Sequence, residues 1–127
     1  MITVADVMTR DVFVLRAEAT LRDAIGYLAT QHVSGAPVLD AKRRMVGTIS
    51  SSDILQAESE GADLDSTSVA DVMTHRTLTV SPGTELREAA LAMEYGEVHR
   101  LFVQHEGALV GVISRSDVSR ALANGLA

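Results

Sequence analysis

Several residue types that build special sites in proteins are scarce or absent from this chain of 127 residues. There is no cysteine, which excludes a disulfide framework, a thiolate metal site and a cysteine nucleophile. Tryptophan is absent and phenylalanine and tyrosine occur twice each, so aliphatic side chains and methionine must build the core. The shortage of aromatic rings also argues against a protein that stacks the bases of a single nucleic-acid strand.

Long apolar runs and excess positive charge are missing as well. No run approaches the roughly 20 residues that a membrane span needs, and the N-terminus lacks a charged-then-apolar signal pattern. We therefore expect no membrane partner and a cytoplasmic protein. The net charge of −6 argues against nucleic acid as the main partner. A small anionic ligand is still compatible with this charge, because a pocket needs only local positive potential.

What the chain does contain is a repeat of itself. Val4–Thr9 returns letter for letter as Val69–Thr74, an offset of 65 residues. Val46–Ile54 returns, with substitutions, as Val110–Val118, an offset of 64 residues. The two offsets indicate a duplicated segment in which the second copy has lost about one residue. We expect copy one to span 1–62 and copy two to span 66–127, packed about a pseudo-two-fold axis with paired clefts and a shared core.

Each copy predicts the order β-α-β-β-α, an α/β (α+β) fold. In copy one, a first strand over 12–15 precedes a helix capped by Thr20, and copy two repeats this helix with Thr84 as its cap. The apolar spacing i, i+3, i+4, i+7 marks one face of this helix in each copy. The two strands and the final helix that follow are expected at 36–39, 45–50 and 52–58 in copy one, and at 101–105, 109–114 and 116–124 in copy two.

A family resemblance rests on three features that occur in order. They are the Asp-Val-Met-Thr opening of each copy, the strand start Ser34-Gly35-Ala36-Pro37-Val38, and the Gly-x-Ile-Ser-x-Ser-Asp close of each copy. With these features the chain resembles a tandem pair of CBS domains, the cystathionine-beta-synthase motif that forms a Bateman module. The resemblance implies two clefts for an adenosyl ligand (AMP, ADP, ATP, S-adenosylmethionine or NAD), no required cofactor, and control of a partner protein that is not identified. It also implies a homodimer.

The Ser-x-Ser-Asp element carries the most chemistry. An ionised aspartate in the first turn of a helix can accept hydrogen bonds from both hydroxyls of a ribose, and the N–H groups at the helix start favour an anion. The alternative interpretation is a plain helix cap, because Ser-x-x-Asp also satisfies the first N–H groups of a helix without any ligand. Both interpretations are open for Asp53 and for Asp117.

The resemblance assigns further residues to the two clefts. The favoured cleft is implied at Thr9, Val33, Ser34, Gly35, Ala36, Pro37, His99, Arg100, Ser114, Ser116 and Asp117. The second cleft is implied at Thr74, Val98, Leu101, Ser50, Ser52 and Asp53. The first is favoured because Gly35 and Ala36 leave room for a flat base, whereas Arg100 and Phe102 make the corresponding wall bulkier.

The remaining polar residues have more than one interpretation. His99 and Arg100 are candidates for binding phosphate, since a guanidinium matches phosphate oxygens, although Arg100 could instead pair with a surface carboxylate. Phe102 is better explained as a core residue, and Met8 and Met73 as packing residues. Weaker polar candidates at the cleft margins are Arg10, His75 and Arg76.

Catalytic and metal sites lack their parts. His32 and His105 have no partners at metal-ligand spacing, so no metal site is expected. The serines have no evident His–Asp arrangement and no phosphate-binding Gly-x-x-x-x-Gly-Lys loop occurs, so we do not expect an enzyme. The sequence therefore predicts a stand-alone regulatory module that binds an adenosyl nucleotide. The alternative is a ligand-free module for dimerisation or scaffolding.

Overall fold

The computed structural model describes residues 1–75 and 78–125, and it confirms the mixed α/β order. The elements of the first half are α1 (Val4–Val7), β1 (Leu15–Arg16), α2 (Leu21–Gln31), β2 (Gly35–Leu39), β3 (Met45–Ser50) and α3 (Ser51–Ser59). Those of the second half are α4 (Val69–Val72), β4 (Thr79–Val80), α5 (Leu86–Gly96), β5 (Arg100–His105), β6 (Ala108–Ser114) and α6 (Arg115–Ala123). Each half is therefore β-α-β-β-α preceded by one short helix.

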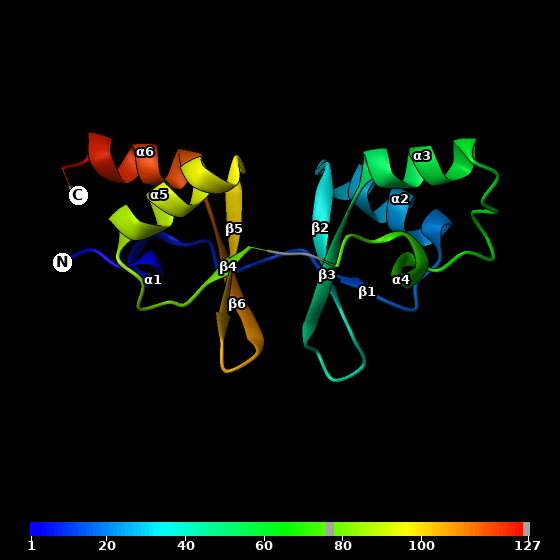
Figure 1. Ribbon diagram of the computed structural model, residues 1–127, viewed down its shortest axis with the longest axis horizontal. Helices are drawn as coiled ribbons and strands as arrows, with labels where there is room; N and C mark the ends of the chain where they lie inside the picture. The colour runs from blue at the N-terminus through cyan, green and yellow to red at the C-terminus, as the bar shows by residue number, and fades with distance from the viewer. Residues whose placement is uncertain (76–77, 126–127) are drawn as a thin grey trace. The chain divides into compact units, whose positions relative to one another are not determined.

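The strands form two three-stranded sheets with the same topology. In the order β1-β2-β3, the short β1 runs parallel to β2, and β2 pairs with β3 as an antiparallel hairpin. The order β4-β5-β6 repeats this arrangement. Helices α2 and α3 cover one face of the first sheet, and α5 and α6 cover one face of the second (Figure 1).

The compact units of the molecule differ from the copies in the sequence. Unit 1 consists of Met1–Val12 with Leu78–Ala127, and unit 2 consists of Phe13–Thr77. The opening segment of copy one thus packs with the sheet of copy two, and the opening segment of copy two packs with the sheet of copy one. This exchange was not predicted from the sequence. The copy boundaries 1–62 and 66–127 remain a prediction about the repeat itself.

Backbone hydrogen bonds hold each exchanged segment in place. In unit 1, Val4 N donates to Thr84 O at 2.8 Å and Leu86 N donates to Ile2 O at 3.0 Å. In unit 2, Val69 N donates to Ala19 O at 2.8 Å. The side chains of Val4 and Val69 are fully buried in the unit that receives them. Each unit therefore depends on a segment that lies far away in the sequence.

In each unit, the glycine of the Gly-x-Ile-Ser motif lies against the Met-Thr pair of an opening segment. A Cβ on Gly47 would lie 2.6 Å from Thr74 O, and one on Gly111 would lie 2.9 Å from Thr9 O. The same Cβ atoms would lie 2.9 Å and 2.7 Å from the sulfurs of Met73 and Met8. The glycine thus leaves room for the Met-Thr pair of the opening segment, which confirms both methionines as packing residues.

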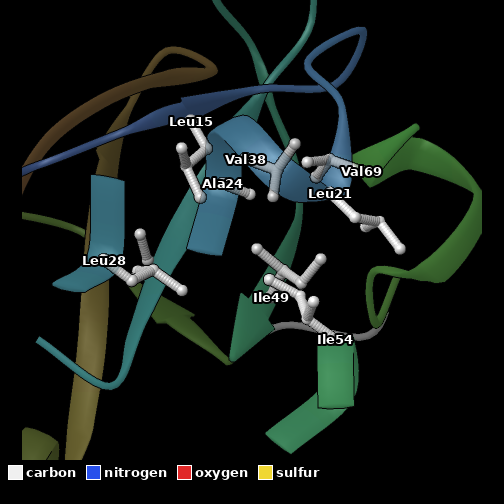
Figure 2. Packing of buried hydrophobic residues seen from close by; sticks show 9 residues of the cluster. Leu15, Leu21, Ala24, Leu28, Val38, Ile49, Ile54 and Val69 are labelled. Carbon is white, nitrogen blue, oxygen red and sulfur yellow. The ribbon is translucent and has the colours of Figure 1, made fainter. Parts of the chain in front are cut away.

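Each unit has its own core, so the expected shared core is wrong. Aliphatic side chains build both cores, as the shortage of aromatic residues predicts. The core of unit 2 gathers side chains from its sheet, its helices and the exchanged α4, as Figure 2 shows. Its buried members are Leu15, Leu21, Ala24, Leu28, Ala36, Val38, Ile49, Ile54 and Val69. In unit 1 the corresponding residues are Val4, Leu86, Ala89, Met93, Leu101, Val103, Ile113 and Ala121.

Two local expectations are wrong and one is confirmed. Thr20 caps α2, because its Oγ1 accepts a hydrogen bond from Asp23 N at 3.1 Å. Thr84 does not cap α5: the cap position is Glu85, which makes no side-chain capping bond. At the 65-residue offset Glu85, not Thr84, is the counterpart of Thr20, and its longer side chain does not replace the hydroxyl. The first strand of copy one is Leu15–Arg16 rather than 12–15.

Candidate functional site

The two Ser-x-Ser-Asp elements form the same structure at the start of α3 and of α6. At α3, Ser50 N donates to Asp53 Oδ2 at 2.9 Å and Asp53 N donates to Ser50 Oγ at 3.1 Å. At α6, Ser114 N donates to Asp117 Oδ2 at 2.8 Å and Asp117 N donates to Ser114 Oγ at 3.2 Å. Each is a capping box, in which serine and aspartate satisfy backbone N–H groups reciprocally. The cap interpretation is confirmed, and the ribose interpretation stays a prediction.

Each capping box lies beside the start of the preceding hairpin in its own unit. In unit 2, Gly35 pairs with Ser50 across the hairpin, and Ser51 N donates to Ser34 O at 2.8 Å. In unit 1, Arg100 pairs with Ser114, and Arg115 N donates to His99 O at 2.9 Å. The hairpin therefore brings the predicted strand-start residues and the predicted helix-start residues to one edge of each sheet.

The threonine of each opening segment pairs with the last strand of the hairpin in its unit, close to the capping box. Thr9 and Val112 exchange two backbone hydrogen bonds of 2.9 Å, and Thr74 pairs in the same way with Thr48. Val112 and Thr48 lie two residues before the serine that begins each capping box. Both threonines are exposed, so their hydroxyls are accessible.

The predicted residues are divided between the two units. Unit 1 holds Thr9, Val98, His99, Arg100, Leu101, Ser114, Ser116 and Asp117. Unit 2 holds Val33, Ser34, Gly35, Ala36, Pro37, Ser50, Ser52, Asp53 and Thr74. The favoured set and the second set each draw residues from both units. Arg76, a weaker candidate, lies outside the described residues.

Burial separates the residues that pack from those that are accessible. Ala36, Pro37 and Leu101 are buried, whereas Ser34, Ser52 and Ser116 are exposed. His99 and Arg100 are also exposed, and among the described residues no ion pair occupies Arg100. Phe102 is buried, which confirms that it is better explained as a packing residue.

The two aspartates differ in what surrounds the carboxylate. Asp117 Oδ1 lies 3.6 Å from Arg120 Nη1, and the Asp117 side chain is only 10% exposed. Its Oδ2 also accepts a bond of 3.0 Å from Ser114 Oγ. In copy one, Gln56 takes the place of Arg120 and donates to Glu60 at 3.3 Å. Among the described residues, Asp53 Oδ1 accepts no hydrogen bond and faces no cation within ion-pair distance.

Arg115 is a second residue near the site that sequence reasoning missed. Its Nε donates to Val98 O at 3.1 Å and its Nη2 donates to Met93 O at 3.4 Å. Its Nη1 lies 3.6 Å from Glu94 Oε2. The guanidinium therefore caps the C-terminal end of α5 and fixes the loop that leads to His99, where a cation is favoured by the helix dipole. The signal was the replacement of Ser51 in copy one by Arg115.

Metal clusters, membrane-spanning helices and cavities are the other kinds of site to consider in the described part of the chain. Within residues 1–75 and 78–125 no cluster of three or more histidine, aspartate or glutamate side chains could hold a metal ion. None of the described helices has the length and apolar character to cross a membrane. An open cavity of about 500 Å³ in unit 1 lies between the N-terminus, α5 and α6, and it contains none of the predicted site residues.

Comparisons with known proteins cover nearly the whole chain. The family model described as "CBS domain" matches residues 4–60 and 69–124. The crystal structure of CBSX2 in complex with AMP, a protein of Arabidopsis thaliana, is 30% identical, with a TM-score of 0.85 over 98% of each chain. A putative acetoin utilization protein, AcuB, from Vibrio cholerae is 31% identical, with a TM-score of 0.87 over 99% of this chain and 93% of that chain.

Several relatives are much longer proteins. The inosine-5′-monophosphate dehydrogenase of Nitrosopumilus maritimus is 29% identical over 89% of this chain but only 23% of its own length. Across the first five curated relatives the chain spans from 22% to 42% of their lengths. The match therefore concerns the repeated module and not the remainder of those proteins.

Proposed function

Because the chain belongs to the CBS-domain family, we propose that it is a regulatory module that binds an adenosyl ligand and modulates a partner protein. The ligand is AMP, ADP or ATP, with S-adenosylmethionine and NAD as further candidates. The observation that carries the proposal is the pair of capping boxes at α3 and α6, each beside a strand start and an exposed threonine. The AMP complex of a structural neighbour 30% identical to this chain supports the same ligand class.

Each residue has a definite task in this proposal. Asp117 and Asp53 use Oδ2 for the capping box and offer Oδ1 to the hydroxyls of a ribose. A charge-assisted bond of this kind contributes about 1.5–3 kcal/mol when it is shielded from water. The small residues Ser34, Gly35 and Ala36 with Pro37 contact the base in the favoured set. His99 and Arg100 bind the phosphate when the ligand carries one.

The module requires no chemical step of its own. Binding changes the partner only as far as the ligand prefers one arrangement of the module over another. We propose no catalytic residue, and we propose the cytoplasm as the compartment on composition alone. The partner is a protein that the ligand-bound module recognises, and the chain works as a homodimer.

Titration calorimetry with AMP, ATP, NAD and S-adenosylmethionine tests the proposal. We expect at least one of them to bind, and Asp117→Ala to weaken that binding about 10- to 100-fold through lost ribose hydrogen bonds. Asp23→Ala is a matched control, because this aspartate also lies in the first turn of a helix but away from both capping boxes. No binding by any ligand at millimolar concentration would contradict the proposal.

A specific observation favours a second candidate, a ligand-free module for dimerisation or scaffolding. Leu91 and Tyr95 lie four residues apart on one face of α5 and are 51% and 86% exposed. Large exposed apolar side chains at such spacing are typical of an interaction surface. Light scattering of the wild type and of Leu91→Glu/Tyr95→Glu tests this candidate: a dimer formed through α5 would dissociate in the double variant, and neither protein would bind any of the four ligands.

A further inference from the structure

Arg120 lies where a ligand would bind Asp117. Its Nη1 is 3.6 Å from Asp117 Oδ1, the oxygen that the capping box leaves free. The proton of Ser114 Oγ is also used, because this hydroxyl donates to Asp117 Oδ2 at 3.0 Å. Both groups that could serve a ribose at the start of α6 are therefore engaged within the protein.

The start of α3 has the same capping box without these contacts. Gln56 stands three residues after Asp53, where Arg120 follows Asp117, and it donates to Glu60 instead. Among the described residues, Ser50 Oγ accepts from Asp53 N but donates to no carboxylate. Asp53 Oδ1 and the Ser50 hydroxyl are thus both available.

We propose that Arg120 competes with the ligand for the Asp117 carboxylate, so that the two aspartates bind the same vicinal diol with different affinity. The proposal rests on the proposed function and adds a residue that sets its affinity. A diol reaches Asp117 Oδ1 only when the guanidinium of Arg120 moves away. The Arg120 side chain is 68% exposed, so water compensates much of this loss and the competition is modest.

For ligands that carry a phosphate, the positive charge of Arg120 also contributes to affinity, with the opposite sign. The guanidinium of Arg120, beside Asp117, attracts a phosphate while it competes with a ribose. Adenosine, which carries the diol but no phosphate, isolates the competition. The analogue 2′,3′-dideoxyadenosine lacks both hydroxyls and is insensitive to it.

The experiment measures adenosine binding by calorimetry in two backgrounds that each leave one aspartate. In Asp53→Asn, where Asp117 is the remaining carboxylate, we expect Arg120→Gln to tighten binding about 2- to 5-fold at low salt, with a smaller gain at high salt. In Asp117→Asn, the double change Gln56→Arg/Glu60→Asn reproduces copy two around Asp53 and is expected to weaken binding by a similar factor. Binding of 2′,3′-dideoxyadenosine is expected to be the same with and without each change.

The outcomes separate the two proposals. If none of AMP, ATP, NAD and S-adenosylmethionine binds to the wild type, the proposed function is wrong and so is the competition. If one of them binds but adenosine does not, the competition is wrong and the proposed function stands. If the wild type binds adenosine but Arg120→Gln leaves its affinity unchanged or lowers it, the competition is wrong and the proposed function stands. A general loss of stability in Arg120→Gln would change binding of the dideoxy analogue equally, which the comparison of the two ligands detects.

Discussion

Unit 1 and unit 2 begin their last helix with the same capping box but surround it with different side chains. In unit 1, Arg120 pairs with Asp117, and Arg115 ties the start of α6 to the end of α5. In unit 2, Gln56 and Ser51 stand at these positions, and neither contacts the carboxylate of Asp53. The two copies therefore share the residues that form the capping box and differ in the charged residues around it.

The largest expected changes in stability come from the two glycines that pack against the Met-Thr pair of an opening segment, one in each unit. We expect Gly47→Ala and Gly111→Ala each to lower the free energy of unfolding by about 1–3 kcal/mol, because the new methyl group overlaps the Met-Thr pair of the opening segment. Gly47→Ala is expected to cost more, since its Cβ would lie nearest a backbone oxygen, at 2.6 Å, whereas the atom nearest the Cβ of Gly111 is a flexible methionine sulfur.

Urea denaturation measures these effects, and Gly26→Ala is the matched control. Gly26 lies inside α2 with no atom within 4 Å of its Cβ position. Alanine there is expected to raise the stability by about 0.5–1 kcal/mol, because glycine is unfavourable in a helix interior. Equal changes in the free energy of unfolding for all three variants would contradict the prediction, because they would show that the Met-Thr pair leaves room for a methyl group at Gly47 and Gly111.

The exchange of opening segments shows where sequence reasoning ends. The order of the elements and the Thr20 cap follow from local patterns, and the structure confirms them. The exchange could not be predicted, because Val4–Thr9 and Val69–Thr74 are identical, so neither segment carries a local preference for one sheet. The wrong cap at Thr84 has a local cause: the hydroxyl lies one residue before the cap position, which Glu85 occupies as the counterpart of Thr20.

The candidate site was predictable only in its repeated part. The capping boxes of α3 and α6 follow from their Ser-x-x-Asp spacing, and the two strand starts lie beside them as hairpin pairing requires. The contacts of Arg115 and Arg120 depend on side-chain direction around a helix start, which the pattern of letters does not contain. The substitutions Ser51 to Arg115 and Gln56 to Arg120 between the copies were the visible signal.

The second-largest expected effect is the loss of stability when the serine hydroxyl of either capping box is removed, and this loss is expected to differ between the two boxes. We expect Ser114→Ala and Ser50→Ala to lower the free energy of unfolding by about 0.5–2 kcal/mol each, as losses of helix caps do. Ser114→Ala is expected to cost more, because its Oγ accepts from Asp117 N and also donates to Asp117 Oδ2. Ser52→Ala, at an exposed position in the first turn of α3, is a control that leaves the cap intact. A larger loss for Ser50→Ala would contradict the ranking.

A smaller effect tests the tie between α6 and α5. Arg115→Ser introduces the residue of copy one and is expected to lower the free energy of unfolding by about 0.5–1 kcal/mol, since it removes a cation from the C-terminal end of α5. The side chain is 43% exposed, which keeps the effect small. Hydrogen exchange is the sharper measurement, because Val98 N donates to Met93 O next to the lost contact. Faster exchange at Val98 and unchanged exchange at its copy-one counterpart Val33 is the expected pattern.

The smallest expected effect distinguishes the two hairpin turns by pH. In unit 2, Asp40 Oδ1 accepts from Arg44 N and Lys42 N, and the hydrogen bond from Arg44 N is the main cause that lowers the pKa of Asp40. In unit 1 the β5–β6 turn uses Glu106 and Gly107, both with positive φ, and has no such carboxylate. The folded pKa of Asp40 is below its unfolded value. The ionised Asp40 carboxylate therefore stabilises the fold at neutral pH, and this stabilisation is lost as the pH falls through the folded pKa. In an NMR titration, the amide chemical shifts of Lys42 and Arg44 are expected to follow the ionisation of the Asp40 carboxyl. The midpoint of this transition is expected below the usual pKa range of an aspartate. Asp40→Asn should remove that transition without altering the amide of Gly107.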